Sequence, residues 1–475
     1  MSNNSRVIPR PSQRRRSRPP VGPESAVTLD LRDRRVGSGS PVVEKLRPGF
    51  RSTYLTLGGV SALGAAVAYG VLGLTGRADS TLGLVIAPVL AAVAYWAINR
   101  WIRPRVGSEL AAVFVAGFGV RLAASVARFL GGADAPIYQR EGVRIASELR
   151  GLNFGVDTGR TVPGTGTIRY LSGIVNVFTG SNYIATFLLF ASVAFIGQCF
   201  FIFAMRRALS PRQFRMLCFL VMLSPTMAFW PSSIGKESLS LLGIGLAAHG
   251  ATQLYDRRWA GMTYVLLGGF AVGMVRPHMA LIVLAGISVG LLARRAHTRG
   301  RMLTHLAVVV VVILGTMAMA GASAELFGLE SFDGVSDVGA ALDFAQERTS
   351  QDTAQFVAAR VENPVDYPWA VVTVLFRPFP WEANNALAMV SAGESALVLA
   401  LLLAALPGLA RHARQFAQRG HLLFSVAFTA VFIFLFSAIG NFGILSRQRA
   451  QVIPFILVFI AFGIAAEKRS LRGAS

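Results

Sequence analysis

The sequence is short of charged residues and of cysteine. Only 15% of its 475 residues are charged, 53% are hydrophobic and the mean hydropathy is +0.53. Globular chains carry roughly a quarter charged residues, so this balance excludes an ordinary soluble protein. The two cysteines, Cys199 and Cys218, lie in apolar runs. They predict core packing, and neither a disulfide framework nor a cysteine metal site follows from them.

Lysine is also scarce, since it occurs only at Lys45, Lys236 and Lys468, and the net charge of +22 therefore comes almost entirely from arginine. Residues 1–52 are rich in Arg, Pro and Ser, which is typical of a disordered basic cytoplasmic tail. The other basic clusters are short and lack the interleaved aromatics that would stack on bases. We therefore expect membrane lipid, and no nucleic acid, as a partner.

Long apolar runs predict an all-α polytopic membrane protein with about twelve transmembrane helices. The runs cover residues 53–75, 82–102, 110–130, 183–205, 216–230, 239–254, 262–275, 279–293, 303–322, 387–409, 422–439 and 452–466. Arginine clusters between them all fall on one side of this topology, including those at 100–105, 206–212, 257–258 and 411–419. By the positive-inside rule that side is cytoplasmic, as are both termini.

This pattern divides the chain into five parts. A basic tail (1–52) and two additional transmembrane helices (53–106) precede a membrane core (107–322) whose first extracytoplasmic loop is 131–180. A second extracytoplasmic loop (323–386) leads to C-terminal transmembrane helices and a short cytoplasmic tail (387–475).

The stretch 131–151 begins where an apolar run stops, and its first charge is Asp134. A helical pattern follows, with one face formed by Tyr138, Gly142, Ile145, Ala146 and Leu149 and the other by Arg140, Arg144 and Ser147. Such a pattern predicts an interfacial helix that ends near Gly151. A single acid of this kind is ordinarily a solvated loop residue. Other unusual side chains on the same side of the membrane favour a functional role for Asp134.

Several ionisable residues interrupt the outer ends of apolar runs, where such groups usually face a polar cavity. They are Lys236, Glu237, Arg276, His278, Arg377, Glu382, Arg447 and Arg449, and we expect them to bind substrate. Arginine binds phosphate oxygens bidentately, so Arg447 and Arg449 with Lys236 predict a site for a lipid-linked phosphate. The alternatives are contacts with lipid headgroups, a Lys236–Glu237 pair and a structural Arg377–Glu382 pair. Ser232 and Ser233 are predicted to cap the helix that starts near Lys236.

The acid in GGADAPIYQREG, which follows an outgoing span and precedes an interfacial helix, resembles the first extracytoplasmic loop of the GT-C superfamily of membrane glycosyltransferases. The turns FWPSSIGKE and NFGILSRQRAQVIP also look like outer turns of bacterial polysaccharide-assembly proteins of this type. The resemblance implies an inverting glycosyltransferase of the bacterial cytoplasmic (inner) membrane with an extracytoplasmic active site. It would move a sugar from a polyprenyl-phosphate carrier to a glycan, lipid or protein acceptor, with Asp134 as the catalytic base.

Three questions stay open at this point. Tyr138 is followed by Gln139 rather than by His, and His278 has no second ligand at metal spacing, so we predict no metal site. A divalent metal remains an alternative. A Wzy-like polysaccharide polymerase or ligase would use the outer arginines without an essential acid. A non-enzymatic flippase or transporter of lipid-linked sugars would instead need charges along both halves of the membrane.

Overall fold

The computed structural model describes residues 81–131, 134–292 and 355–466, with a few positions between 339 and 349. All of them belong to one compact unit, Arg47–Ser475. Within these residues the chain is helical and has no strand, and a single isolated bridge joins Gln355 to Asn441. The predicted tail 1–52 and the predicted spans 53–75 and 303–322 lie outside the described residues. So do residues 323–338 of the predicted loop 323–386 and several of its positions between 340 and 354.

Three helices of the described part are long and apolar enough to cross a membrane: α4 (Ser108–Gly131), α7 (Tyr183–Met205) and α16 (Ala386–Arg411). A fourth span would be formed by α19 (Phe442–Arg449) and α20 (Ile453–Ala466), which meet at an angle of 58°. The prediction of a helical membrane protein is therefore supported. The number of spans and the GT-C arrangement stay predictions.

Shorter or more polar helices occupy the other predicted runs that the structure describes. They are α2 (Thr81–Ala97, continued by the π-helical turn Ile98–Ile102), α8 (Pro211–Leu223), α9 (Pro225–Phe229), α10 (Lys236–Tyr255), α11 (Ala260–Gly273), α12 (Pro277–Leu292) and α18 (Gly420–Phe436). The predicted run 216–230 is broken between α8 and α9, because Pro225 cannot donate a helical hydrogen bond. Ser224 ends α8 there, and its hydroxyl accepts a hydrogen bond from the Met227 N–H, which caps α9.

The helices pack around a core rich in phenylalanine. Phe428 of α18 stacks on Phe455 of α20 with 4.1 Å between ring centroids, and Phe432 stacks on Phe436 at 4.2 Å. Cys218 is fully buried in the same core and Cys199 is partly buried against it, both as free thiols. The predicted packing role of the cysteines is confirmed.

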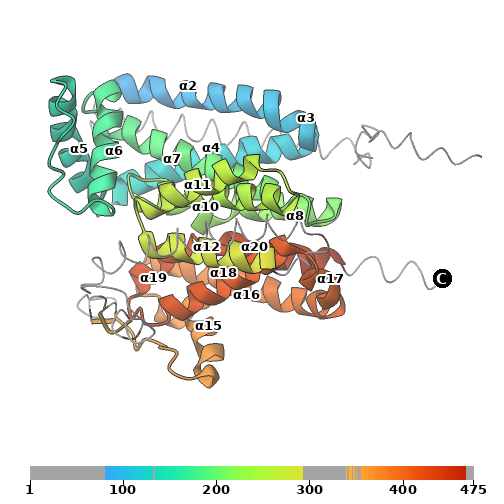
Figure 1. Ribbon diagram of the computed structural model, residues 1–475. Coiled ribbons are helices and arrows are strands. Elements are labelled where there is room, and N and C mark those ends of the chain that lie inside the picture. Colours follow the sequence, from blue (N-terminus) through green and yellow to red (C-terminus); the bar gives the residue numbers. More distant parts are fainter. Residues whose placement is uncertain are drawn as a thin grey trace, which may run out of the picture. The chain divides into compact units, whose positions relative to one another are not determined.

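Most of the predicted loop 131–180 is a helical hairpin of α5 (Ala135–Arg150) and α6 (Thr165–Thr179). Figure 1 shows these two helices side by side, running across the ends of α4 and α7. The face of α5 that was predicted to be apolar is buried, and Arg140, Arg144 and Ser147 are exposed. The amphipathic pattern of this stretch is confirmed, and Gly151 caps the helix as expected.

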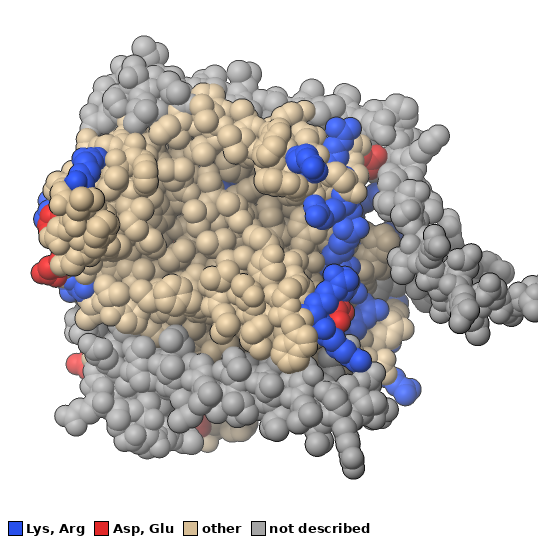
Figure 2. All heavy atoms as spheres, turned by 45° about the horizontal axis from the view of Figure 1, so that its top comes forward, with Lys and Arg blue, Asp and Glu red and all other residues tan. Residues whose placement is uncertain are grey.

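Arginines gather at the opposite end of the helices. They lie in α3 (Arg103–Val106), in the α7–α8 turn, after α10, at the end of α16, in α17 (Ala413–Ala417) and just after α17. Arg207 forms an ion pair with Asp256, and Arg419 donates a hydrogen bond to the carbonyl of Ala208, so these turns meet. Figure 2 shows Lys and Arg concentrated along one edge of a largely apolar face. This segregation agrees with the positive-inside prediction, whereas the compartments that the two ends face stay a prediction.

Candidate functional site

Five of the predicted site residues converge at the end of the helices that carries the α5–α6 hairpin. They form what we call the ionic cluster: Asp134, Lys236, Glu237, Arg276 and Arg447. Each residue stands at or near a helix end, just before α5, at the start of α10, just before α12 or within α19. Four segments that are far apart in the sequence therefore supply one site.

Glu237 lies at the centre of the ionic cluster and is only 2% exposed. Its carboxylate accepts hydrogen bonds from Arg447 Nε at 2.5 Å and from Arg447 Nη2 at 3.3 Å. Arg276 also donates to Glu237, and its other terminal nitrogen donates to the side chain of Gln448. Two guanidinium groups thus compensate the buried carboxylate. Glu237 does not form the alternative ion pair with Lys236.

Asp134 marks the open side of the cluster. Its Oδ2 accepts a hydrogen bond from Arg447 Nη1 at 2.5 Å, yet the side chain stays 49% exposed. The exposed fraction rises from 2% at Glu237 to 23% at Arg447 and then to 49% at Asp134. Asp134 is therefore the carboxylate of the cluster that a bound molecule can reach, and Arg447 holds it in place.

Arg128 adjoins the cluster although it is not among the residues that the sequence pattern predicts. It lies in α4, with its guanidinium carbon 5.1 Å from the ring centroid of Phe229 and 5.0 Å from that of Trp230. It interacts electrostatically with Asp134, Glu237 and Arg447. The signal for it was present in the sequence, because an ionisable residue inside an apolar run is a functional candidate by default.

Arg121, seven residues before Arg128 in α4, holds the turn that leads into α10. It is fully buried and donates to the carbonyl of Met227 at 2.6 Å and to the hydroxyl of Ser232 at 3.3 Å. Ser233 similarly faces Arg128, with 3.5 Å between Oγ and Nη2. No side chain caps α10, so the prediction that Ser232 and Ser233 cap this helix is wrong. Two arginines from a distant segment engage the serines instead.

Arg377, Glu382 and Arg449 form a second group apart from the ionic cluster. Arg377 Nε is 3.0 Å from Glu382 Oε1, and Arg449 donates to the carbonyl of Arg377 and to the Ser395 hydroxyl at 2.6 Å. Burial alone would raise the pKa of the Glu382 carboxyl, but hydrogen bonds from Arg377 and from the Phe379 N–H hold that pKa below its ordinary value. Arg377 and Glu382 thus form the ion pair that the sequence analysis named as the alternative to a substrate-binding role.

Arg449 does not join Arg447 although only one residue separates them. Positions i and i+2 point to different sides of a helix, and α19 directs Arg447 towards Glu237 and Arg449 towards Ser395. Arg449 is 3% exposed, which leaves it little access to a ligand. We therefore leave Arg449 out of the proposed site.

His278 lies in the first turn of α12 beside the cluster, with 6.1 Å between its ring centroid and that of Phe436. It interacts electrostatically with Arg276 and Lys236. Among the described residues, no group of three or more His, Cys, Asp or Glu side chains is placed to hold a metal ion.

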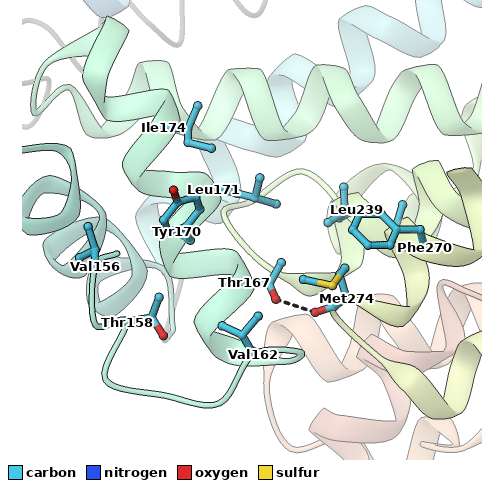
Figure 3. Close-up of a pocket in the computed structure, with 11 residues that line it drawn as sticks. Val156, Thr158, Val162, Thr167, Tyr170, Leu171, Ile174, Leu239, Phe270 and Met274 are labelled. Atoms are coloured by element: carbon cyan, nitrogen blue, oxygen red, sulfur yellow. Dashed lines mark hydrogen bonds between the residues drawn. The ribbon is translucent and has the colours of Figure 1, made fainter. Parts of the chain in front are cut away.

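An apolar groove of about 540 Å³ is lined by residues of the α5–α6 hairpin, of α10 and of the C-terminal part of α11. Figure 3 shows Leu171 and Ile174 of α6 facing Leu239 of α10 and Phe270 of α11 across it. Thr167 Oγ1 donates to the carbonyl of Met274 at 2.7 Å, which ties α6 to the end of α11. Leu239 lies one turn beyond Lys236 on the same side of α10, and Met274 lies two residues before Arg276. Two of the segments that line the groove therefore also carry residues of the charged site.

Comparisons with known proteins do not identify a family for this chain. No protein-family model matches this chain, and no match was found among curated proteins or solved structures.

Proposed function

We propose that this protein is a membrane glycosyltransferase that moves a sugar from a polyprenyl-phosphate carrier to an extracytoplasmic acceptor. The observation that carries the proposal is the half-exposed carboxylate of Asp134, held by Arg447 at the mouth of a cationic cluster beside an apolar groove. Sugar transfer from such a carrier needs a base, a site for phosphate and a place for a hydrocarbon chain. All three have candidates at the same end of the folded protein.

Asp134 is the proposed base. The acceptor hydroxyl oxygen attacks the anomeric carbon of the sugar, and its proton passes to the free lone pair of the Asp134 carboxylate. The bond between the anomeric carbon and the phosphate oxygen breaks, with its electron pair remaining on that oxygen. The departing phosphate needs no proton, so one catalytic carboxylate is enough, unlike glycoside hydrolysis, which uses two. Arg447 orients Asp134 through Oδ2 and leaves the carboxylate half exposed to the acceptor.

The groove suits the prenyl chain of the carrier. Its volume of about 540 Å³ lies in the range of ligand pockets, roughly 300–1,000 Å³. Its lining is largely aliphatic, and Phe270 at its rim is 67% exposed. A prenyl chain lying there would place its phosphate near Lys236 and Arg276. Leu239, which lines the groove, follows Lys236 closely in the sequence, and Met274, which also lines it, comes just before Arg276.

The test is sugar transfer by the purified protein from a panel of polyprenyl-phosphate sugars, with Asp134→Asn compared against wild type. Removing a general base should lower the rate roughly a hundred- to ten-thousand-fold, because the amide keeps the size of the side chain but cannot take the proton. Asp157→Asn is the matched control, because Asp157 is an exposed acid in the same hairpin and its carboxylate accepts only a local hydrogen bond, from the Gly159 N–H.

Wild-type turnover by Asp134→Asn would refute the base assignment. The polymerase or ligase alternative predicts that result, with Arg447→Ala as the damaging substitution. A flippase would move lipid-linked sugars across vesicles without forming a product in this assay.

A further inference from the structure

Cations outnumber carboxylates in the ionic cluster and its neighbour Arg128. Arg447 contacts both Asp134 and Glu237, and Arg276 contacts Glu237, so these two arginines are matched by two carboxylates. Arg128 and Lys236 are the remaining cations, and neither forms an ion pair within the described part of the chain. Two positive charges are therefore left over, one on Arg128 and one on Lys236.

Arg128 is buried without a full set of acceptors. It is 9% exposed, its Nε has no hydrogen-bond partner among the described residues, and its contact with the Ser233 hydroxyl is long at 3.5 Å. The rings of Phe229 and Trp230 hold the guanidinium plane by cation–π contact but accept no conventional hydrogen bond. A buried arginine is normally paired, because removing its charge from water is costly. Arg128 is thus oriented towards the site and still has N–H groups to donate.

Lys236 is placed where helix electrostatics oppose it. It is the first residue of α10, and a positive charge at a helix N-terminus is unfavourable. Arg276 and Arg447 repel it there, and Glu237 and Asp134, which attract it, form their ion pairs with those arginines instead. No side chain caps the start of α10, whose N-terminal end itself favours a negative charge. An anion between Lys236 and Arg128 would compensate both the buried charge of Arg128 and the unfavourable positive charge at the start of α10.

We propose that Arg128 and Lys236 form a binding site for a doubly charged phosphate headgroup on a lipid. The anion site follows from the charges and hydrogen bonds above, and its role in sugar transfer rests on the proposed function. Two headgroups carry this charge. One is the pyrophosphate diester of a pyrophosphate-linked donor, and the other is the phosphate monoester that remains when the sugar has left.

A preference of this site for a doubly charged over a singly charged phosphate would contribute to catalysis as well as to binding. A sugar phosphodiester carries one negative charge, and the carrier phosphate carries about two after the sugar departs. The electron pair of the broken bond stays on the phosphate oxygen beside Arg128 and Lys236, while the acceptor proton moves to Asp134. Fixed cations that match the charge developing in the transition state lower the barrier. Arg447 and Arg276 instead hold the two carboxylates.

The preference can be measured by titration calorimetry on the full-length protein in detergent at pH 8. The ligands are farnesyl phosphate, its singly charged methyl ester, and neutral farnesol. Wild type should bind the monoester at least about tenfold more tightly than the methyl ester. Arg128→Gln and Lys236→Met should each weaken monoester binding about tenfold to a hundredfold, the usual range for one bond to a charged group.

Controls separate charge recognition from misfolding. Both variants should bind farnesol as wild type does, and Lys236→Arg should keep the preference for the monoester. Arg140→Gln, which removes an exposed arginine of α5, should leave all three affinities unchanged. A methyl farnesyl pyrophosphate diester tells the two headgroups apart. Binding tighter than that of the monoester assigns the site to a pyrophosphate-linked donor, and weaker binding assigns it to the departing monophosphate.

Equal affinities of wild type for the monoester and its methyl ester would overturn the anion site, whatever the variants do. Monoester binding unchanged in both Arg128→Gln and Lys236→Met would overturn it as well. A preference for the doubly charged headgroup without sugar transfer from any donor would instead refute the proposed transferase and leave the anion site standing.

Discussion

Of the two carboxylates in the ionic cluster, Glu237 is expected to contribute more to the thermal stability of the protein than Asp134. Glu237→Gln keeps nearly the same shape but removes the charge that Arg276 and Arg447 both contact. The new amide retains one acceptor oxygen, and its NH₂ group would face a guanidinium that has nothing to accept with. Two arginines would then share a buried region with a single, half-exposed carboxylate, Asp134.

The expected loss follows from burial. Glu237 is 2% exposed and the Arg276 side chain is 5% exposed, so the pair is shielded from water. Removing one partner of a buried ion pair costs about 3–5 kcal/mol, mostly because the other charge is left uncompensated. Asp134 is 49% exposed, and solvent screens its pair with Arg447. Asp134→Asn should therefore change the stability far less than Glu237→Gln does.

The two cysteines of the chain provide the assay. Cys218 is fully buried and Cys199 is partly buried in the helical core, and both are free thiols. A dye that fluoresces on reacting with thiols should therefore report helix separation during heating of the purified protein. We expect a clearly lower midpoint for Glu237→Gln, and a midpoint close to wild type for Asp134→Asn. Glu141→Gln, which alters an exposed i,i+3 pair with Arg144 on α5, is the matched control.

An unchanged midpoint for Glu237→Gln would refute the reasoning, because a buried carboxylate between two arginines cannot lose its charge without cost. The double variant Glu237→Gln/Arg276→Met gives a second check. It removes the stranded cation together with the carboxylate, so it should recover part of the lost stability. If the two losses simply add, the residues do not interact as the structure shows.

Two further predictions concern the helix packing and the topology. Gly245→Ala should lower the thermal midpoint, because a β-carbon there would lie 2.0 Å from the Gly197 carbonyl oxygen and force α10 away from α7, at a cost of roughly 1–3 kcal/mol. Gly269→Ala, with no atom within 4 Å, is the control and should leave the midpoint near wild type. In a cysteine-free background, Phe154→Cys in the α5–α6 hairpin should react with an impermeant maleimide in intact cells, whereas Arg258→Cys should react only after lysis. The reverse labelling pattern would invert the proposed topology.

Local sequence was enough to predict α7 and the buried face of α5. The run 183–205 coincides with α7, and the positions that the helical period of α5 selects, such as Tyr138 and Ile145, are buried. Both features depend on hydrophobicity and spacing within one segment, which the chain displays without reference to its fold. The Arg377–Glu382 pair was accessible as an alternative for the same reason, since five positions separate its members.

Hydrogen bonds and ion pairs between segments far apart in the sequence were not predictable in this way. Arg447 and Arg449 are equivalent in the sequence, and the direction of α19 sends one to Glu237 and the other to Ser395. Ser232 and Ser233 lie where helix-capping residues belong, yet they face Arg121 and Arg128, more than a hundred positions earlier. A capping preference is a local tendency of modest energy, and a buried arginine that needs an acceptor outweighs it.

The sequence by itself thus determined which side chains are unusual for a membrane helix and at which helix ends they stand. Only the tertiary structure decided which charges cancel, because Asp134 and Arg447 meet across 313 positions and Glu237 and Arg276 across 39. Electrostatic energy depends on the distance between two groups and on their burial, and neither quantity is a property of a local segment. The excess charge on Arg128 and Lys236 exists only because the fold has paired the other cations of the cluster with its two carboxylates.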